Sequence, residues 1–219
     1  MTRIHSLAVA ALVVVTMPLA GQTVASAGTA AVTAPVAVTL PPIPTPRQFT
    51  HWGQVESTYD ESENSSSVSL TLAFDDTQRG VFIRRGAMRS VEMSTGYVFA
   101  GKTAAAYPDV MTLVLKFTRP TDVALRSDRE GTGDMAIYVD GGVPMVVPGP
   151  LVSRNGLDIS GGRARYVEDT YIVVLSLGQF LKVVNGAQVD AQLHDIRMEF
   201  TGGPLEAMRD LASRLYAAP

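Results

Sequence analysis

The sequence of 219 residues contains no cysteine. Disulfide bonds, thiolate nucleophiles and cysteine metal ligands are therefore excluded, and a folded domain has to be stabilised by its hydrophobic core. Histidine is scarce too, because only His51 and His194 lie outside the extreme N-terminus. The sequence also lacks G-x-S-x-G, H-E-x-x-H, P-loop and dinucleotide-binding motifs.

This shortage of reactive groups argues against catalysis. A hydrolytic triad needs a histidine beside a serine and an acid, and a zinc site commonly uses at least two histidines or cysteines. Asp195 follows His194, but adjacent residues in a strand point to opposite faces. The acidic pairs Asp75-Asp76 and Glu168-Asp169 flank predicted strands, which favours solvation of strand ends over the paired carboxylates of a glycosidase. We predict no catalytic residue, no metal ligand and no cofactor.

The chain also lacks a hydrophobic run long enough for a comfortable membrane span, since the apolar segment at 7–20 is short and contains Pro18. Arg3 precedes this segment and Ala25-Ser26-Ala27 follow it, which is the order of a cleaved secretory signal. We predict a signal peptide over residues 1–27, cleavage near Ala27, and a secreted or periplasmic protein with no remaining transmembrane span. An uncleaved anchor is the alternative.

The segment that follows the predicted signal peptide is almost uncharged. Residues 28–47 consist mainly of Ala, Thr, Val and Pro, with no charged residue before Arg47, and their five prolines exclude a regular helix or central strand. We predict an extended linker at 28–47, with a surface tether as the alternative, and a single domain at 48–219. The net charge of −3 argues against a nucleic-acid partner, and 15 arginines against three lysines suggest a GC-rich bacterial genome.

Alternation of apolar and polar residues dominates the domain. Segments in which every second residue is apolar are typical of half-buried strands, and they occur at 68–74, 111–117, 135–139, 189–193 and 196–200. Val110 and Val114, on the back of the second segment, predict a central strand that is covered on both faces. With the buried run at 171–175, this pattern predicts a mainly β fold, a two-layer antiparallel β-sandwich.

Turn residues predict how the strands connect. Asp140-Gly141 supplies the positive φ angles of a hairpin turn, and two prolines place the returning strand at a sheet edge. Asn155-Gly156 predicts another hairpin within 151–159. The alternation slips at His194-Asp195, where we predict a β-bulge rather than a tight turn, because this pair lacks the glycine that type I′ turns favour.

Two short helices are expected to pack on the sheets. Ser176 and Gln179 have the spacing of a capping box, which predicts a helix at 177–185 that ends with a left-handed residue at Asn185-Gly186. A C-terminal helix is predicted at 204–216. Its apolar residues share one face and predict a buried stripe of Leu205, Met208, Leu211, Ala212 and Leu215.

Four arginines, Arg79, Arg84, Arg85 and Arg89, lie within eleven residues. On a single face they would bind phosphate, sulfate or lipid head groups, because guanidinium groups bind such anions bidentately. Arg84 and Arg85 are neighbours on an extended segment and cannot both point the same way. A solvated strand edge is therefore favoured, with ligand binding by the four arginines as the alternative.

Aromatic residues make up 7% of the sequence, and Trp52 is the single tryptophan. Trp52 is a candidate ligand-binding residue, because together with Tyr59, Tyr97 and Tyr107 it could form a platform on which sugars stack. The favoured interpretation places these four rings in the core of the sandwich or at its rim.

Several structural motifs occur together between residues 99 and 215. They are Phe99-Ala100-Gly101-Lys102 before Pro108, the Asp140-Gly141 turn, and the segments 177–185 and 205–215. In these motifs the chain resembles a recurring type of exported bacterial β-domain of unknown function, which has no assigned activity or functional residues. The C-terminal layout is also similar to accessory periplasmic proteins of type VI secretion, which usually carry cysteines that this chain lacks.

The sequence therefore predicts an exported, non-catalytic β-sandwich domain that binds a protein or ligand at the cell envelope. An enzyme of unrecognised, hydrolase-like type and a carbohydrate-binding module are the alternatives. The sequence leaves the specific partner and the oligomeric state open.

Overall fold

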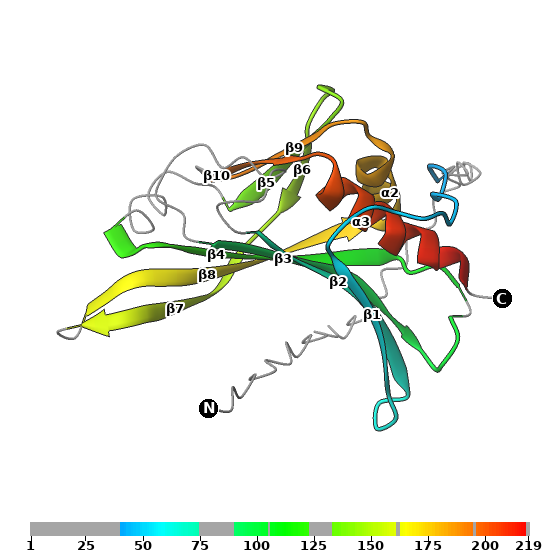
Figure 1. The fold of residues 1–219 in the computed structure, drawn as a ribbon, viewed down its shortest axis with the longest axis horizontal. Helices are drawn as coiled ribbons and strands as arrows, with labels where there is room; N and C mark the ends of the chain where they lie inside the picture. Colours follow the sequence, from blue (N-terminus) through cyan, green and yellow to red (C-terminus); the bar gives the residue numbers. More distant parts are fainter. Residues whose placement is uncertain are drawn as a thin grey trace, which may run out of the picture. The chain divides into compact units, whose positions relative to one another are not determined.

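The computed structural model describes residues 40–74, 90–104, 106–122, 133–160, 163–194 and 196–217. The strands in these ranges form two antiparallel sheets, shown in Figure 1. The larger sheet has the order β1 (Gln54–Asp60), β2 (Ser65–Phe74), β3 (Ser90–Ala100), β4 (Val110–Pro120), β8 (Arg163–Ser176) and β7 (Leu151–Ser160). The smaller sheet has the order β10 (Ile196–Phe200), β9 (Val189–Leu193), β5 (Asp134–Val139) and β6 (Met145–Pro148).

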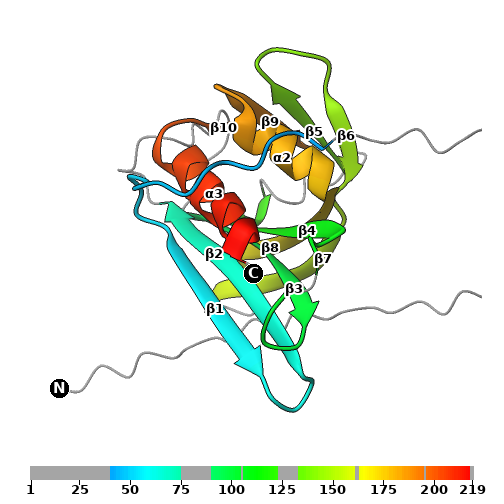
Figure 2. The same ribbon diagram turned by 90° about the vertical axis from the view of Figure 1, so that its right-hand side faces the viewer.

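The sheets and helices form two layers around one core. The six-stranded sheet is one layer, and the four-stranded sheet lies over one of its faces together with helices α2 (Leu177–Asn185) and α3 (Gly203–Ser213) (Figures 1 and 2). Every second strand residue points between the layers, so that Leu70, Leu115 and Val173 have no exposed surface. The predicted fold class, mainly β with two antiparallel layers and two helices, is confirmed.

The outer face of the six-stranded sheet is open to solvent. β4 is central, between β3 and β8, as the sequence predicts. However, Val110 on β4 is 48% exposed and Val174 on β8 is 50% exposed. The prediction that β4 is covered on both faces is therefore wrong, because the second layer packs on the inner face only.

Helix α2 begins as predicted and ends differently. The Ser176 hydroxyl accepts a hydrogen bond from the Gln179 amide at 3.2 Å, and the Gln179 side chain accepts one from the Ser176 amide at 2.8 Å. These two bonds complete the capping box. The predicted left-handed end is wrong, because Gly186 has φ −67°. Glycine provides space there instead, since a Cβ on Gly186 would lie 2.5 Å from Cγ1 of Val139.

Helix α3 is shorter than the predicted helix at 204–216. It continues as a 3₁₀ turn, η1 (Arg214–Ala217), which changes the last predicted helical turn to a tighter form. The predicted stripe is buried throughout and faces the core, as shown by Leu205, Met208, Leu211, Ala212 and Leu215. The end of this helix brings Arg214 to the end of the six-stranded sheet.

Two predicted connections are wrong. β9 and β10 pair as a hairpin with Leu193 opposite Ile196, so a two-residue connection replaces the predicted bulge at His194-Asp195. His194 takes the left-handed conformation that the turn requires, with φ 54°. The predicted hairpin at Asn155-Gly156 is also absent, because β7 continues through these residues and pairs with β8 on both sides of them.

The Asp140-Gly141 turn is confirmed. Asp140 has φ 52° and Gly141 has φ 69°, and β6 beyond them is an edge strand of the smaller sheet, as its prolines predict. The Asp140 carboxylate accepts hydrogen bonds from the amides of Ala187 and Gln188 at 2.8 and 2.9 Å. The turn is thereby tied to the connection between α2 and β9.

Residues 40–53, which we call the strap, lie across both helices (Figure 2). The Asn185 side chain of α2 donates a hydrogen bond to the carbonyl of Pro42 at 2.7 Å. The Arg47 guanidinium contacts the Glu206 carboxylate of α3 at 2.9 Å. The strap therefore belongs to the folded domain. Within the described ranges, no helix combines the length and the apolar character that a membrane crossing requires.

Candidate functional site

An open groove of about 410 Å³ lies at one end of the inner face of the six-stranded sheet. Its floor is formed by β1, β2 and β3, and its walls by the β3–β4 connection and η1. The lining residues are Ser57, Thr58, Tyr59, Ser66, Ser67, Val68, Tyr97, Phe99, Lys102, Thr103, Ala104, Ala106, Pro108, Arg214 and Leu215. Small-molecule sites typically enclose about 300–1,000 Å³, so the groove has the size of a ligand site.

Strand register builds the floor of the groove. One cross-strand row consists of Ser57, Val68 and Tyr97, and the next consists of Tyr59, Ser66 and Phe99. Directly opposite residues of antiparallel strands have their side chains on the same face. Because Val68 and Tyr97 are buried, both rows belong to the core side of the sheet. The groove is therefore the end of the core face that the helices leave open.

The β3–β4 connection forms a fixed wall where it starts. The Gly101 amide donates a hydrogen bond to the carbonyl of Asn64 at 2.7 Å, and the Ser66 hydroxyl donates one to the carbonyl of Gly101 at 2.7 Å. Gly101 has φ 76°, a left-handed conformation that favours glycine. These contacts join the connection to the β1–β2 hairpin and hold Lys102 beside the groove.

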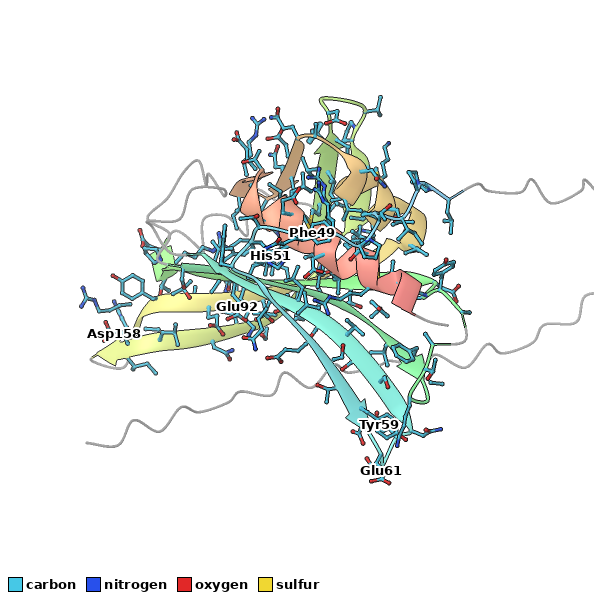
Figure 3. All side chains as sticks on the ribbon, turned by 45° about the vertical axis from the view of Figure 1, so that its right-hand side comes forward. Phe49, His51, Tyr59, Glu61, Glu92 and Asp158 are labelled. Carbon is cyan, nitrogen blue, oxygen red and sulfur yellow. The ribbon has the colours of Figure 1, made fainter. Side chains whose placement is uncertain are left out.

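Three aromatic rings line the groove. The rings of Tyr97 and Phe99 are stacked, with centroids 6.1 Å apart and planes 30° apart. Tyr59 lies near the tip of the β1–β2 hairpin (Figure 3), where its hydroxyl donates to Oδ1 of Asn64 at 3.0 Å. The ammonium group of Lys102 lies 4.9 Å from the centroid of the Tyr59 ring, a cation–π contact. The groove therefore offers flat apolar surfaces beside a positive charge.

Lys102 and Arg214 are the charged residues of the groove. Among the described lining residues there is no carboxylate and no histidine. Arg214 pairs with Asp210, one helical turn earlier, through a contact of 3.2 Å between Nη2 and Oδ2. General acid–base catalysis needs a positioned proton donor or acceptor that titrates near neutral pH. The described lining supplies none of the usual carboxylate or histidine groups.

Hydroxyl groups complete the lining. Burial raises the pKa of Tyr97 above its usual value of 10.0, and the positive charge of Arg214 opposes part of this rise. The Tyr97 hydroxyl is therefore protonated at neutral pH and can donate a hydrogen bond. The other hydroxyls on the groove side belong to Ser57, Ser66 and Tyr59 of the sheet and to Thr103 of the β3–β4 connection.

The structure brings together two of the four residues of the predicted aromatic platform, Tyr59 and Tyr97. Tyr59 and Tyr97 line the groove, whereas Tyr107 is 48% exposed in the β3–β4 connection and Trp52 lies on the strap. The Trp52 indole donates to the carbonyl of Ala73 at 3.4 Å, and its ring packs against a glycine of α3. Phe99 was not predicted as a site residue, although its spacing of two from Tyr97 places both on one face of a strand.

The four predicted arginines, Arg79, Arg84, Arg85 and Arg89, fall within 75–89, outside the described residues. Ligand binding by this cluster therefore stays a prediction. Lys102 and Arg214, which were not predicted as site residues, are the cations among the described residues that line this groove.

The two histidines have different surroundings. His51 lies beside α3 (Figure 3), with Nε2 3.2 Å from Oδ2 of Asp210. His194 lies in the β9–β10 turn, with its ring centroid 5.6 Å from that of Tyr171. In the part of the chain that the structure describes, no group of three or more histidine, aspartate or glutamate side chains is placed to hold a metal ion.

Asp169 is part of a buried polar cluster. Its carboxylate, on β8, accepts hydrogen bonds from Arg119 of β4 at 2.9 Å and from Nη2 of Arg154 of β7 at 3.1 Å. Arg119 also donates to the Tyr171 hydroxyl at 3.1 Å. The interpretation of Glu168-Asp169 as strand-end solvation is therefore wrong for Asp169, because β8 continues past it on both sides. Asp169 has no exposed surface and Arg119 is 1% exposed, which assigns the pair to stability.

Comparison with known proteins gives no further guide to the site. No family model matches the chain, and neither a curated protein nor a solved structure matches it significantly.

Proposed function

We propose that this domain is an exported, non-catalytic binding module at the bacterial cell envelope, and that its ligand binds in the groove between Tyr59, Tyr97 and Phe99. The observation that carries the proposal is the meeting of three aromatic rings with several hydroxyl groups in one open groove of about 410 Å³. Binding sites commonly combine apolar walls with a few polar groups that orient the ligand.

A sugar ring fits this lining best. A pyranose ring has apolar C–H faces, which pack on aromatic rings, and a rim of hydroxyl groups, which exchange hydrogen bonds with serine, threonine and tyrosine. The openness of the groove to solvent also suits one segment of a longer glycan. Carbohydrate binding is therefore the form of the binding function that we favour over a hydrolase-like enzyme.

Export is the second part of the proposal. It is supported by the signal-like order of the first 27 residues and by the proline-rich segment that follows. A place in the cell envelope or outside it, and a relation to the exported bacterial β-domains that the chain resembles, agree with these features. N-terminal sequencing of the protein recovered from a bacterial culture tests cleavage near Ala27.

The groove is tested with a panel of soluble oligosaccharides and uniformly ¹⁵N-labelled protein. We expect at least one glycan to shift the amide resonances of groove residues, such as Ser67 and Gly101, in a saturable way. The variants Tyr59→Ala and Phe99→Ala should weaken this binding, whereas Tyr107→Ala, an exposed tyrosine outside the lining, should not. Circular dichroism of each variant checks that the fold is retained.

Two results would contradict the proposal. One is that the glycans leave the groove resonances unchanged, or bind equally well to Tyr59→Ala and Phe99→Ala. The other is turnover of an ester, glycoside or phosphoester substrate that a single aspartate, glutamate or histidine substitution abolishes, since this result would identify an enzyme.

A further inference from the structure

We infer that the ligand of this groove is an acidic sugar, a ring that carries a carboxylate, and that Lys102 and Arg214 bind its negative charge. The inference rests on the proposed function and adds the charge of the ligand to it. Its basis is the contrast between the groove and the rest of the chain.

The charge of the groove is opposite to that of the protein. The chain has a net charge of −3, yet the charged side chains of the described groove lining are one lysine and one arginine. Groove walls of low dielectric strengthen the attraction between these cations and an anionic ligand. A neutral glycan would gain hydrogen bonds from these side chains but no charge–charge attraction, so the two cations favour an anionic one.

Lys102 is placed to act on a ring that stacks on Tyr59. Its ammonium group lies over the Tyr59 ring, and the described residues provide it with no ion-pair partner. A ligand ring that takes the place of the lysine on Tyr59 brings its substituents next to the ammonium group. A carboxylate on that ring then forms a charge-assisted hydrogen bond, which is stronger than a bond between neutral groups.

Arg214 has donors left for a ligand. Its contact with Asp210 joins one nitrogen to one oxygen at 3.2 Å, and its side chain is 44% exposed. A guanidinium group carries five N–H donors in a planar fork, so one contact leaves a carboxylate-binding edge unoccupied. The neighbouring hydroxyl of Tyr97 can donate a further hydrogen bond to the sugar.

A sugar carboxylate agrees with the lining better than an anionic lipid does. A lipid chain would need an enclosed apolar channel, whereas this groove is open and carries hydroxyl groups among its aromatic rings. A sulfate ester would present the same charge on the same type of ring. The experiment therefore includes a sulfated glycan, whose tighter binding would overturn the carboxylate assignment.

The test uses two probes with the same sugar chain, an oligogalacturonate and its fully methyl-esterified form, in which each carboxylate is a neutral methyl ester. Isothermal titration calorimetry with the purified full chain should show that the acid binds on the order of tenfold more tightly than the ester. Higher ionic strength should reduce this difference, because salt screens exposed charges. A sulfated oligosaccharide of similar length is titrated alongside.

Substitutions of Lys102 and Arg214 test whether the negative charge of the ligand binds in the groove. Lys102→Met and Arg214→Met should each lower the affinity for the acid on the order of tenfold and leave that for the ester unchanged. The matched controls are Lys116→Met, on the outer face of β4, and Arg197→Met on β10, which should change neither affinity. Asp210→Asn should raise the affinity for the acid a few-fold, because it removes the carboxylate that competes for Arg214.

The possible outcomes distinguish failure of the acidic-sugar inference from failure of the glycan-binding proposal. Equal binding of acid and ester, with loss of both in Phe99→Ala, would overturn the acidic-sugar inference and leave the glycan-binding proposal intact. Acid binding that Lys102→Met and Arg214→Met do not change would also overturn the inference, since the anion would then bind elsewhere. Lack of binding by every glycan would overturn both.

Discussion

Arg119 and Asp169 form a buried ion pair between adjacent strands. Their closest contact is 2.8 Å, and the two side chains are 2% and 0% exposed. Arg154, directly opposite Asp169 on β7, contacts the same carboxylate. One carboxylate thus joins three strands of the larger sheet, β4, β8 and β7.

We expect Asp169→Asn to lower the free energy of unfolding by about 3–5 kcal/mol, because two guanidinium groups lose the charge that compensates their burial. Urea denaturation monitored by circular dichroism measures this loss. Glu168→Gln is the matched control, since Glu168 is only half-buried and lies on the other face of β8, and it should cost less than about 0.5 kcal/mol. Equal effects of the two substitutions would contradict a specific role for the pair.

Tyr97 makes stability fall at alkaline pH. Burial raises its pKa in the folded protein above the usual 10.0, so the folded state holds the phenolic proton at a pH where the unfolded state has released it. Stability from this group is therefore complete below pH 10 and is lost as pH rises toward the raised folded pKa. Tyr97→Phe should remove this part of the pH dependence, and Tyr107→Phe, at an exposed position, should keep it.

The measurement is the free energy of unfolding in urea from pH 8 to pH 11 for the wild type and both variants. The wild type should lose more stability than Tyr97→Phe across the upper part of this range. Parallel curves for the two proteins would show that Tyr97 titrates alike in the folded and unfolded states, contrary to the prediction.

The capping box of α2 should contribute measurably to stability. Ser176→Ala removes the acceptor of the Gln179 amide and should lower the free energy of unfolding by about 1 kcal/mol. Ser176→Gly should lower it by only a few tenths of a kcal/mol. Thermal and urea unfolding of both variants provide the comparison. Equal losses for alanine and glycine would indicate that the loss comes from other contacts of the serine.

The features that were predicted correctly from the sequence depend on residues close together in the chain. Alternation identified the buried faces of β2, β4, β5, β9 and β10, and the Ser176–Gln179 spacing identified the start of α2. The prediction for Asp169 was wrong because a charged residue inside a strand is costly without a partner, and its partner Arg119 lies 50 residues away in the chain. The sequence alone does not reveal such a pairing.

Only the part of the groove that lies within one strand could be predicted from the sequence. Tyr97 and Phe99 are two residues apart on one strand, so their common face follows from the period of a strand. Tyr59 joins them through the register of β1, β2 and β3, and Arg214 through the packing of α3. The left-handed conformation of His194 could not be predicted from the sequence, because its positive φ depends on the hairpin that encloses it rather than on its side chain.

Gly186 provides a test of packing without backbone strain. Its φ of −67° suits any residue, but a Cβ there would lie 2.5 Å from Cγ1 of Val139. We expect Gly186→Ala to destabilise the domain by about 1–3 kcal/mol through overpacking alone. Gly178→Ala is the control, because its Cβ would meet Leu40 at an ordinary 3.6 Å and alanine favours the helix by up to about 1 kcal/mol.

A double-mutant cycle with Val139→Ala isolates the steric cause. Val139→Ala removes the methyl group that the new Cβ would meet, so the cost of Gly186→Ala should be smaller in the Val139→Ala background than in the wild type. Residues in contact typically show interaction energies of about 0.5–3 kcal/mol in such cycles, which urea denaturation resolves. If the two substitutions were additive, the cost of Gly186→Ala would have to arise from the unfolded state or from Val189, which lies 3.3 Å from the same Cβ position.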